Sequence, residues 1–205
     1  TMEGGEGAGK STQCRLLSDA LARNGRKVVR TREPGGSPGA EEIRRLLVDG
    51  DVDRWDAMSE TLLLLAARRN HVGHVIRPAL QRGDWVVCDR FSDSTVAYQG
   101  YGHGLDRAML QDLSARVLDE FAPDATLILD IPVDVGLARA ASRDGGEDRY
   151  ERMDRAFHER LRQGFLEIAR HEPDRCIVID ASADMAAVQA AIAGAIAARL
   201  PGALP

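Results

Sequence analysis

The stretch "EGGEGAGKST", residues 3–12, places four glycines ahead of a lysine and two hydroxyl side chains. Gly4, Gly9, Lys10 and Ser11 satisfy the phosphate-loop pattern G-x-x-x-x-G-K-[ST]. Glycines let backbone N–H groups turn inward around phosphate oxygens, and the N-terminus of a following helix adds its dipole. The residues behind the loop, "TQCRLLSDALA", have helical periodicity, which disfavours the alternative of a flexible glycine turn. The stretch therefore predicts a site for a nucleoside triphosphate.

The loop also assigns individual roles. Lys10 is predicted to reach the β- and γ-phosphates, and the hydroxyl of Ser11 is predicted to ligate Mg²⁺. The predicted ATP-binding residues are Gly4, Gly5, Glu6, Gly7, Ala8, Gly9, Lys10, Ser11 and Thr12.

The rest of the chain alternates short apolar runs with helical patterns. The apolar runs are 27–31, 85–89, 125–130 and 176–180, and the clearest helical patterns are 106–121, with Asp106 as N-cap, and 184–199. Runs that are apolar throughout are typical of strands buried on both faces of a parallel sheet. The pattern predicts one α/β domain over residues 1–205, a three-layer P-loop NTPase fold with a parallel central sheet of about five strands flanked by helices, and a short lid over about 142–152. A strand should also precede the glycine loop, so we expect the numbered chain to begin inside it.

Composition excludes several classes of protein. The chain is 44% hydrophobic and 29% charged, and its net charge of -5 argues against a general nucleic-acid binder. No apolar run approaches the roughly 18 residues of a membrane span. Its three cysteines fit neither a zinc nor a disulfide spacing, which favours a cytoplasmic location.

Three further stretches follow predicted strands or lie in a helix: "TREPGGSPG" (31–39), "AARRNH" (66–71) and "DRFSDSTVAYQGYG" (89–102). Residues directly after parallel strands gather at the carboxyl edge of the sheet, where α/β folds bind ligands. Together with the glycine loop, these stretches resemble bacterial thymidylate kinases, a family of nucleoside monophosphate kinases. The resemblance runs from residue 3 to about residue 180, with four motifs in the family's order.

The resemblance implies a dTMP site and a reaction, the transfer of the γ-phosphoryl group of ATP to dTMP. Arg68 matches the arginine that reads the thymine base, Thr95 faces the base, and Tyr98 crowds a ribose 2′-hydroxyl. The implied dTMP-binding residues are Glu6, Glu33, Pro34, Leu64, Arg68, Arg90, Ser94, Thr95, Tyr98 and Gln99, with Arg32 in support. The implied metal ligands for Mg²⁺ are Ser11 and Asp89, with Glu6 nearby.

The implied catalytic residues are Lys10, Arg90, Arg143 and Arg149, the last two in the lid. A phosphate monoester with a second pKa of about 6 is already a nucleophile at neutral pH, so no general base is needed. These cations are expected to neutralise the charge that moves with the phosphoryl group. The variable loop positions carry no positive charge, which is typical of members whose basic residue lies in the lid.

The sequence leaves several alternatives open. Leu64 stands where the family usually has a phenylalanine over thymine, so another ring such as Tyr101 is a candidate to contact the base, and some use of dUMP is expected. Another nucleotide or nucleoside kinase is the nearest rival. A regulatory GTPase is disfavoured because no N-K-x-D stretch is present, and a binding module without catalysis is disfavoured because the charged residues are retained. The resemblance implies a homodimer, and the apolar stretch 61–67 fits either a partner helix or core packing.

Other reactive side chains are predicted to be structural. His71 and His74 have a spacing that suits a metal but lack a third ligand. Cys14 and Cys88 lie in apolar surroundings and are expected to pack rather than react.

Overall fold

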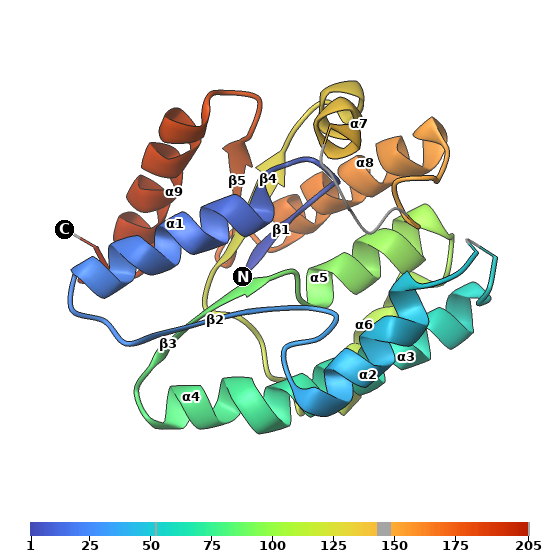
Figure 1. Ribbon diagram of the computed structural model, residues 1–205, viewed down its shortest axis with the longest axis horizontal. Coiled ribbons are helices and arrows are strands. Elements are labelled where there is room, and N and C mark those ends of the chain that lie inside the picture. Colours follow the sequence, from blue (N-terminus) through green and yellow to red (C-terminus); the bar gives the residue numbers. More distant parts are fainter. Residues whose placement is uncertain (52, 143–148, 205) are drawn as a thin grey trace.

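The computed structural model describes residues 1–51, 53–142 and 149–204. Its centre is a parallel sheet of five strands in the order β2-β3-β1-β4-β5 (Figure 1). The strands are β1 (Met2–Gly4), β2 (Val28–Arg32), β3 (Trp85–Asp89), β4 (Thr126–Asp130) and β5 (Cys176–Asp180). The four strands predicted from apolar runs are confirmed to within a residue or two, and so is the strand before the glycine loop. The predicted α/β class and five-stranded parallel sheet are confirmed.

The position of β1 explains where the site forms. This strand lies at the centre of the sheet, with Met2 opposite Asp89 of β3 on one side and Leu127 of β4 on the other. Strands β2 and β3 lie on one side of β1, and strands β4 and β5 lie on the other. The carboxyl end of β1 is therefore the topological switch point of the sheet. The glycine loop starts at that point.

Helices and helical turns connect the strands. They are α1 (Lys10–Arg23), α2 (Pro38–Val48), α3 (Ala57–His71), η1 (Val72–Ile76), α4 (Arg77–Gln81), α5 (Ser92–Thr95), η2 (Val96–Gly102), α6 (Arg107–Leu118), α7 (Val133–Ala141), α8 (Arg155–His171) and α9 (Met185–Arg199). Asp106 caps α6 by accepting a hydrogen bond from the backbone N–H of Met109 at 3.1 Å, which confirms the predicted start. The predicted helix over 184–199 is confirmed as α9.

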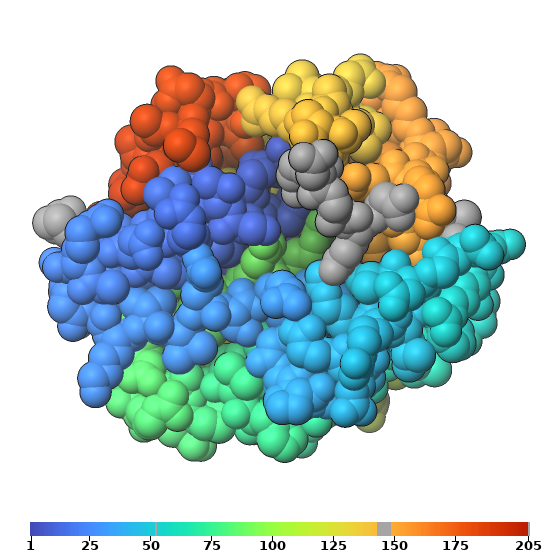
Figure 2. Space-filling model, viewed as in Figure 1, coloured from blue at the N-terminus to red at the C-terminus, as the bar shows by residue number. Residues whose placement is uncertain are grey.

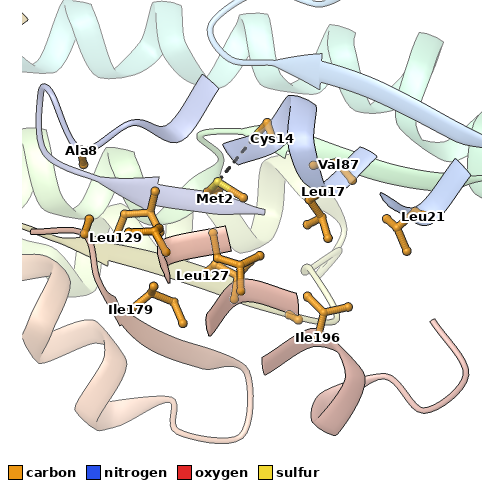
Figure 3. Packing of buried hydrophobic residues seen from close by; sticks show 14 of the residues in the cluster. Met2, Ala8, Cys14, Leu17, Leu21, Val87, Leu127, Leu129, Ile179 and Ile196 are labelled. Atoms are coloured by element: carbon orange, nitrogen blue, oxygen red, sulfur yellow. Dashed lines mark hydrogen bonds between the residues drawn. The ribbon is translucent and has the colours of Figure 1, made fainter. Parts of the chain in front are cut away.

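The largest cluster of buried apolar residues packs α1 and α9 against one face of the sheet (Figures 1 and 3). Leu17 and Leu21 of α1, Leu127 of β4 and Ile196 of α9 meet there. The Met2 and Cys14 sulfur atoms lie 3.8 Å apart at the base of the glycine loop. This cluster fixes α1, and therefore the glycine loop, against the central strands.

The other face is covered by η2 and α8. Phe157, Leu161 and Phe165 of α8 pack on Ile128 of β4 and on Tyr98 of η2. A third cluster joins Cys88 of β3 to η1 and α6. Helices on both faces complete the predicted three layers.

Candidate active site

A pocket of about 480 Å³ opens at the carboxyl edge of the strands. In Figure 2 this face of the molecule is hollowed between the blue N-terminal segment and the cyan helices α2 and α3, with green atoms of the segment after β3 deep in the hollow. The predicted site residues that line it are Glu6, Gly7, Gly9, Lys10, Ser11, Thr12, Arg32, Glu33, Pro34, Leu64, Arg68, Asp89, Arg90, Ser94, Thr95, Tyr98, Gln99 and Arg149. The structure therefore brings residues from all four motifs to one cavity.

The glycine loop requires glycine where the chain passes close to α7. Gly7 has φ +68°, and a Cβ atom built on it would lie 1.9 Å from the carbonyl oxygen of Gly136. The Nζ atom of Lys10 donates a hydrogen bond to the carbonyl of Gly5 at 2.7 Å. Burial, with repulsion from Arg90, lowers the pKa of Lys10 to about 8 against the pull of neighbouring carboxylates. Lys10 thus lies inside the curve of the loop, where a bound anion would stabilise its charged form.

Arg90 has an unusual backbone conformation for a side chain of its size, with φ +67°. Its backbone N–H donates to the carbonyl of Met2 at 2.9 Å, which holds the turn after β3 against β1. Its Nη2 donates to Glu6 Oε1 at 2.7 Å, and its Nη1 donates to the carbonyl of Gly4 at 3.1 Å. A strained turn held from several sides is typical of a functional position.

Glu6 is the acidic partner of this arginine. Its Oε1 also accepts a hydrogen bond from the hydroxyl of Tyr98 at 2.6 Å. Burial acts to raise the pKa of Glu6, but Arg90 and Lys10 outweigh it and lower the pKa to about 2. Glu6 is therefore ionised, and its Oε1 orients Arg90 and Tyr98.

Glu33, Arg68 and His71 form a buried group that links β2 to α3. Arg68 Nε donates to Glu33 Oε2 at 2.5 Å, and His71 Nδ1 lies 3.0 Å from Glu33 Oε1. Arg68 also donates to Thr95 Oγ1 at 2.8 Å. The Glu33–Pro34 peptide bond is cis. Glu33 thus holds Arg68 in place, the arginine that the resemblance assigns to the thymine base.

Ser11 and Asp89 bring two oxygen ligands together. The Ser11 hydroxyl donates to Asp89 Oδ2 at 2.5 Å, at a position open to the pocket. Hydroxyl and carboxylate oxygens are ligands that suit Mg²⁺, which keeps several waters when it binds proteins and nucleotides. The donor set therefore fits the predicted cation. Within the described residues, no cluster of three or more His, Cys, Asp or Glu side chains forms a metal site built from protein alone.

Glu3, the middle residue of β1 directly before the glycine loop, has a role that the sequence did not reveal. Its Oε1 accepts from the backbone N–H of Phe91 at 2.7 Å, and its Oε2 accepts from the Ser94 hydroxyl at 2.6 Å. The side chain is completely buried. Burial, helped by the nearby Asp93, raises the pKa of Glu3 to about 7. Glu3 therefore ties β1 to the segment that carries Arg90.

This raised pKa predicts a pH-dependent difference between the wild type and Glu3→Gln. The folded state holds the Glu3 proton more tightly than the unfolded state, so the wild type loses stability as pH rises from about 4.5 to about 7. We expect the unfolding free energy of the wild type to fall by about 3 kcal/mol relative to the variant over this range. Urea unfolding of both proteins at pH 4.5, 6 and 7.5 measures it. A difference that stays constant with pH contradicts the assignment.

Of the two predicted lid arginines, Arg143 lies outside the described residues. Arg149 is described and lines the pocket, where it forms an ion pair with Glu60 of α3 and donates to the carbonyl of Leu47 at 3.1 Å. Glu60 also accepts a hydrogen bond from Gln99 Nε2 at 2.7 Å. Glu60 was not predicted as a site residue. The one feature of the sequence that points to it is its spacing: it precedes Leu64 and Arg68 by four and eight residues, which places all three on one face of the helix.

The described aromatic side chains that line the pocket do not include Tyr101, which was a candidate to contact the base. Tyr98 and Tyr150 line the cavity, whereas Tyr101 is absent from the described residues that line it. The Tyr101 hydroxyl donates instead to Glu167 of α8 at 2.7 Å. The suggestion that Tyr101 contacts the base is therefore wrong, because this residue faces α8. Leu64 lines the pocket as predicted.

The structure gives the surroundings of the cysteines and histidines that were predicted to be structural. Cys14 and Cys88 are buried, and burial raises the pKa of both thiols above their usual value. His71 bonds to Glu33, and His74 Nδ1 lies 2.9 Å from the carbonyl of Asn70 in its own helix. None of the helices in the described part of the chain has the length and apolar character to cross a membrane.

Comparison with known proteins gives a consistent result. A sequence model of the thymidylate kinase family matches residues 2–192. The thymidylate kinase of Caulobacter vibrioides is 58% identical over 200 residues, covering 98% of this chain and 96% of that protein. The Afipia carboxidovorans thymidylate kinase is 50% identical, covering 100% of this chain and 91% of that protein. The crystal structure of thymidylate kinase from Ehrlichia chaffeensis superposes with a TM-score of 0.76 at 36% identity, over 95% of both chains.

Proposed function

This chain belongs to the thymidylate kinase family and transfers the γ-phosphoryl group of ATP to dTMP, giving dTDP and ADP, and we propose which of its residues carry out each part of that reaction. The main observation is convergence: Lys10 and Ser11 of the glycine loop and Asp89 and Arg90 of the 89–102 stretch line one pocket. The reaction must hold two anionic nucleotides end to end. A pocket with fixed cations and inward-facing amides suits that task.

We assign the donor nucleotide to the glycine loop. The residues of the loop from Gly4 to Thr12 would surround the ATP phosphates, with the dipole of α1 directed at them. Lys10, now bonded to Gly5, would transfer its hydrogen bond to a phosphate oxygen. This exchange is supported by the lowered pKa of Lys10, because a polyanion would stabilise its charged form.

We assign the acceptor nucleotide to the residues around Arg68 and Tyr98. Glu33 and Thr95 hold the Arg68 guanidinium, and Arg68, Thr95 and Leu64 all line the pocket. Arg90 would contact the acceptor phosphate, since Glu6 fixes one edge of its guanidinium. Because the acceptor oxygen is already anionic, these residues position it and neutralise charge rather than remove a proton. We propose that Arg143 and Arg149 add positive charge from the lid.

We propose that Mg²⁺ is required, with Ser11 and Asp89 as its protein-side partners. Their oxygens converge at the pocket wall beside the glycine loop. When bound there, the ion would reduce the negative charge on the β- and γ-phosphate oxygens. Glu6 stays with Arg90 and Tyr98, so it contributes to this region through its charge.

We propose a cytoplasmic homodimer. The three cysteines are free thiols, as expected in a reducing compartment. Leu46 of α2 and Leu62 of α3 are exposed by 39% and 53%, which supports a partner surface on these two helices. Sedimentation of the wild type and of Leu62→Arg tests the dimer: the wild type should sediment as a dimer and the variant as a monomer.

A panel of acceptors tests the acceptor assignment. ADP release is followed with MgATP and dTMP, dUMP, the ribonucleotide of thymine or AMP, each with and without EDTA. We expect dTMP to react fastest, with dUMP slower by about 10- to 200-fold in kcat/KM, because one methyl group separates them. Activity should vanish with EDTA and return with added Mg²⁺. Equal rates with dTMP and AMP, or full activity in EDTA, would refute the corresponding assignment.

A further inference from the structure

Glu60 is a buried charge that none of the four motifs contains. It lies on α3, is 1% exposed, and accepts a hydrogen bond from Gln99 at 2.7 Å. Its second carboxylate oxygen pairs with the guanidinium of Arg149. The cost of burying a carboxylate is offset only by close partners, so a buried glutamate beside a ligand pocket needs an explanation.

The ionic partner of Glu60 comes from the described part of the predicted lid, residues 149–152, which we name the lid end. Arg149 is 4% exposed, and its guanidinium lies 5.5 Å from the centre of the Tyr150 ring. Burial, together with the nearby Glu60 carboxylate, raises the pKa of Tyr150. One carboxylate of α3 therefore pairs with Arg149 of the lid end, and Arg149 lies against the ring of the next residue.

The lid end in turn contacts the residues assigned to phosphoryl transfer. The Tyr150 ring packs edge-on against Tyr98, with ring centres 5.0 Å apart. Tyr98 donates to Glu6, which pairs with Arg90. A continuous set of contacts thus runs from Glu60 through Arg149, Tyr150 and Tyr98 to Glu6.

We propose that Glu60 is a positioning residue for phosphoryl transfer, which holds the lid end so that Arg149 and Tyr150 face the pocket. This inference rests on the proposed function, because it concerns the same pocket and acts through Arg149. Glu60 itself contacts neither nucleotide in this scheme. Its contribution is geometric, and misplacement of a catalytic group by about 1 Å can lower a rate by roughly 10²-fold.

The central variant is Glu60→Gln, which keeps the shape of the side chain and removes its charge. Arg149 then loses its ion pair with Glu60 while its guanidinium stays buried. We expect kcat with dTMP to fall about 10-fold or more, with a smaller change in the KM for ATP. The same variant should be cleaved by trypsin after Arg149, which is buried in the wild type, in the absence of any nucleotide.

Two further variants separate positioning from stability. Glu60→Asp keeps the charge but is one methylene shorter, so it should fold and show an intermediate loss of kcat and intermediate cleavage. The double variant Glu60→Gln/Arg149→Gln should have the same kcat as Arg149→Gln alone, because Glu60 acts through that residue. Asp134→Asn is the matched control: it removes the exposed pair with Arg155, 2.8 Å apart, and should change neither readout.

The outcomes are distinct. Loss of kcat together with new cleavage at the lid end supports the proposal. Unchanged kcat in folded Glu60→Gln overturns it, and so does a loss of kcat without new cleavage. If Glu60→Gln does not fold, a fully active Glu60→Asp overturns it. Wild-type protein that fails to convert dTMP refutes the proposed function instead, while the cleavage experiment still reports whether Glu60 holds the lid end.

Discussion

Replacing Arg90 with alanine is expected to lower kcat for dTMP phosphorylation by about 10³-fold or more, since arginines that stabilise a moving phosphoryl group are worth roughly 10³–10⁵. The guanidinium is held by Glu6, by the carbonyl of Gly4 and, at 4.9 Å, by the face of the Tyr98 ring. This arrangement presents a fixed charge that needs no rearrangement during the reaction. Steady-state kinetics with MgATP and dTMP measures the effect.

Loss of Arg90 also leaves the buried Glu6 carboxylate without its cation, so stability must be measured in parallel. Arg90→Lys keeps the charge but cannot bond Glu6, Gly4 and an acceptor phosphate together. We expect this variant to fold and to lose at least about 10²-fold in kcat. The control is Arg116→Ala on α6, whose side chain is 75% exposed and pairs with Asp112, one helical turn before it. Folded Arg90→Lys with wild-type kcat would remove Arg90 from the mechanism.

Lys10→Ala is expected to have the second largest effect, a fall in kcat of about 10²–10³-fold, which is typical for the loss of one preorganised donor to developing charge. Lys10 begins α1, where alanine is well tolerated, so the fold should be retained. Affinity for ATP should also weaken. Rapid-quench kinetics and nucleotide titration separate the two effects.

The lowered pKa of Lys10 gives this prediction a pH dependence. Above about pH 8 the free protein loses the lysine charge, so ATP binding in the wild type should weaken as pH rises past this value. Lys10→Ala should lack that dependence. Lys27→Ala is the natural control because Lys27 is exposed near the start of β2. A pH profile for ATP affinity that is identical in the wild type and Lys10→Ala would contradict the role.

The fold was largely predictable because its central strands are buried. Runs such as "TLILD" of β4 are mostly apolar, and a parallel sheet covered by helices on both faces buries such a strand. The order of the strands was not predictable in this way. It depends on which helix covers which face, and that is decided by contacts between distant residues such as Leu17 and Ile196.

The site was predictable where a residue lies in a motif with fixed spacing, as Lys10, Arg90 and Arg68 do. It was not predictable where a residue acts through burial. Glu3 and Glu60 resemble ordinary charged residues in the sequence, and their importance comes from partners 88 and 89 positions away, Phe91 and Arg149. Leu64 is an intermediate case: its place at the pocket was foreseen, but its effect on base selection needs the acceptor panel.

The most direct test uses phosphorus NMR of the purified protein with MgATP and dTMP. We predict the appearance of dTDP and ADP in equal amounts, with no free phosphate beyond the uncatalysed background, because the pocket directs the phosphoryl group to the acceptor and not to water. Folded protein that binds ATP but leaves dTMP unconverted, or that releases inorganic phosphate instead, would contradict phosphoryl transfer between two nucleotides in this pocket.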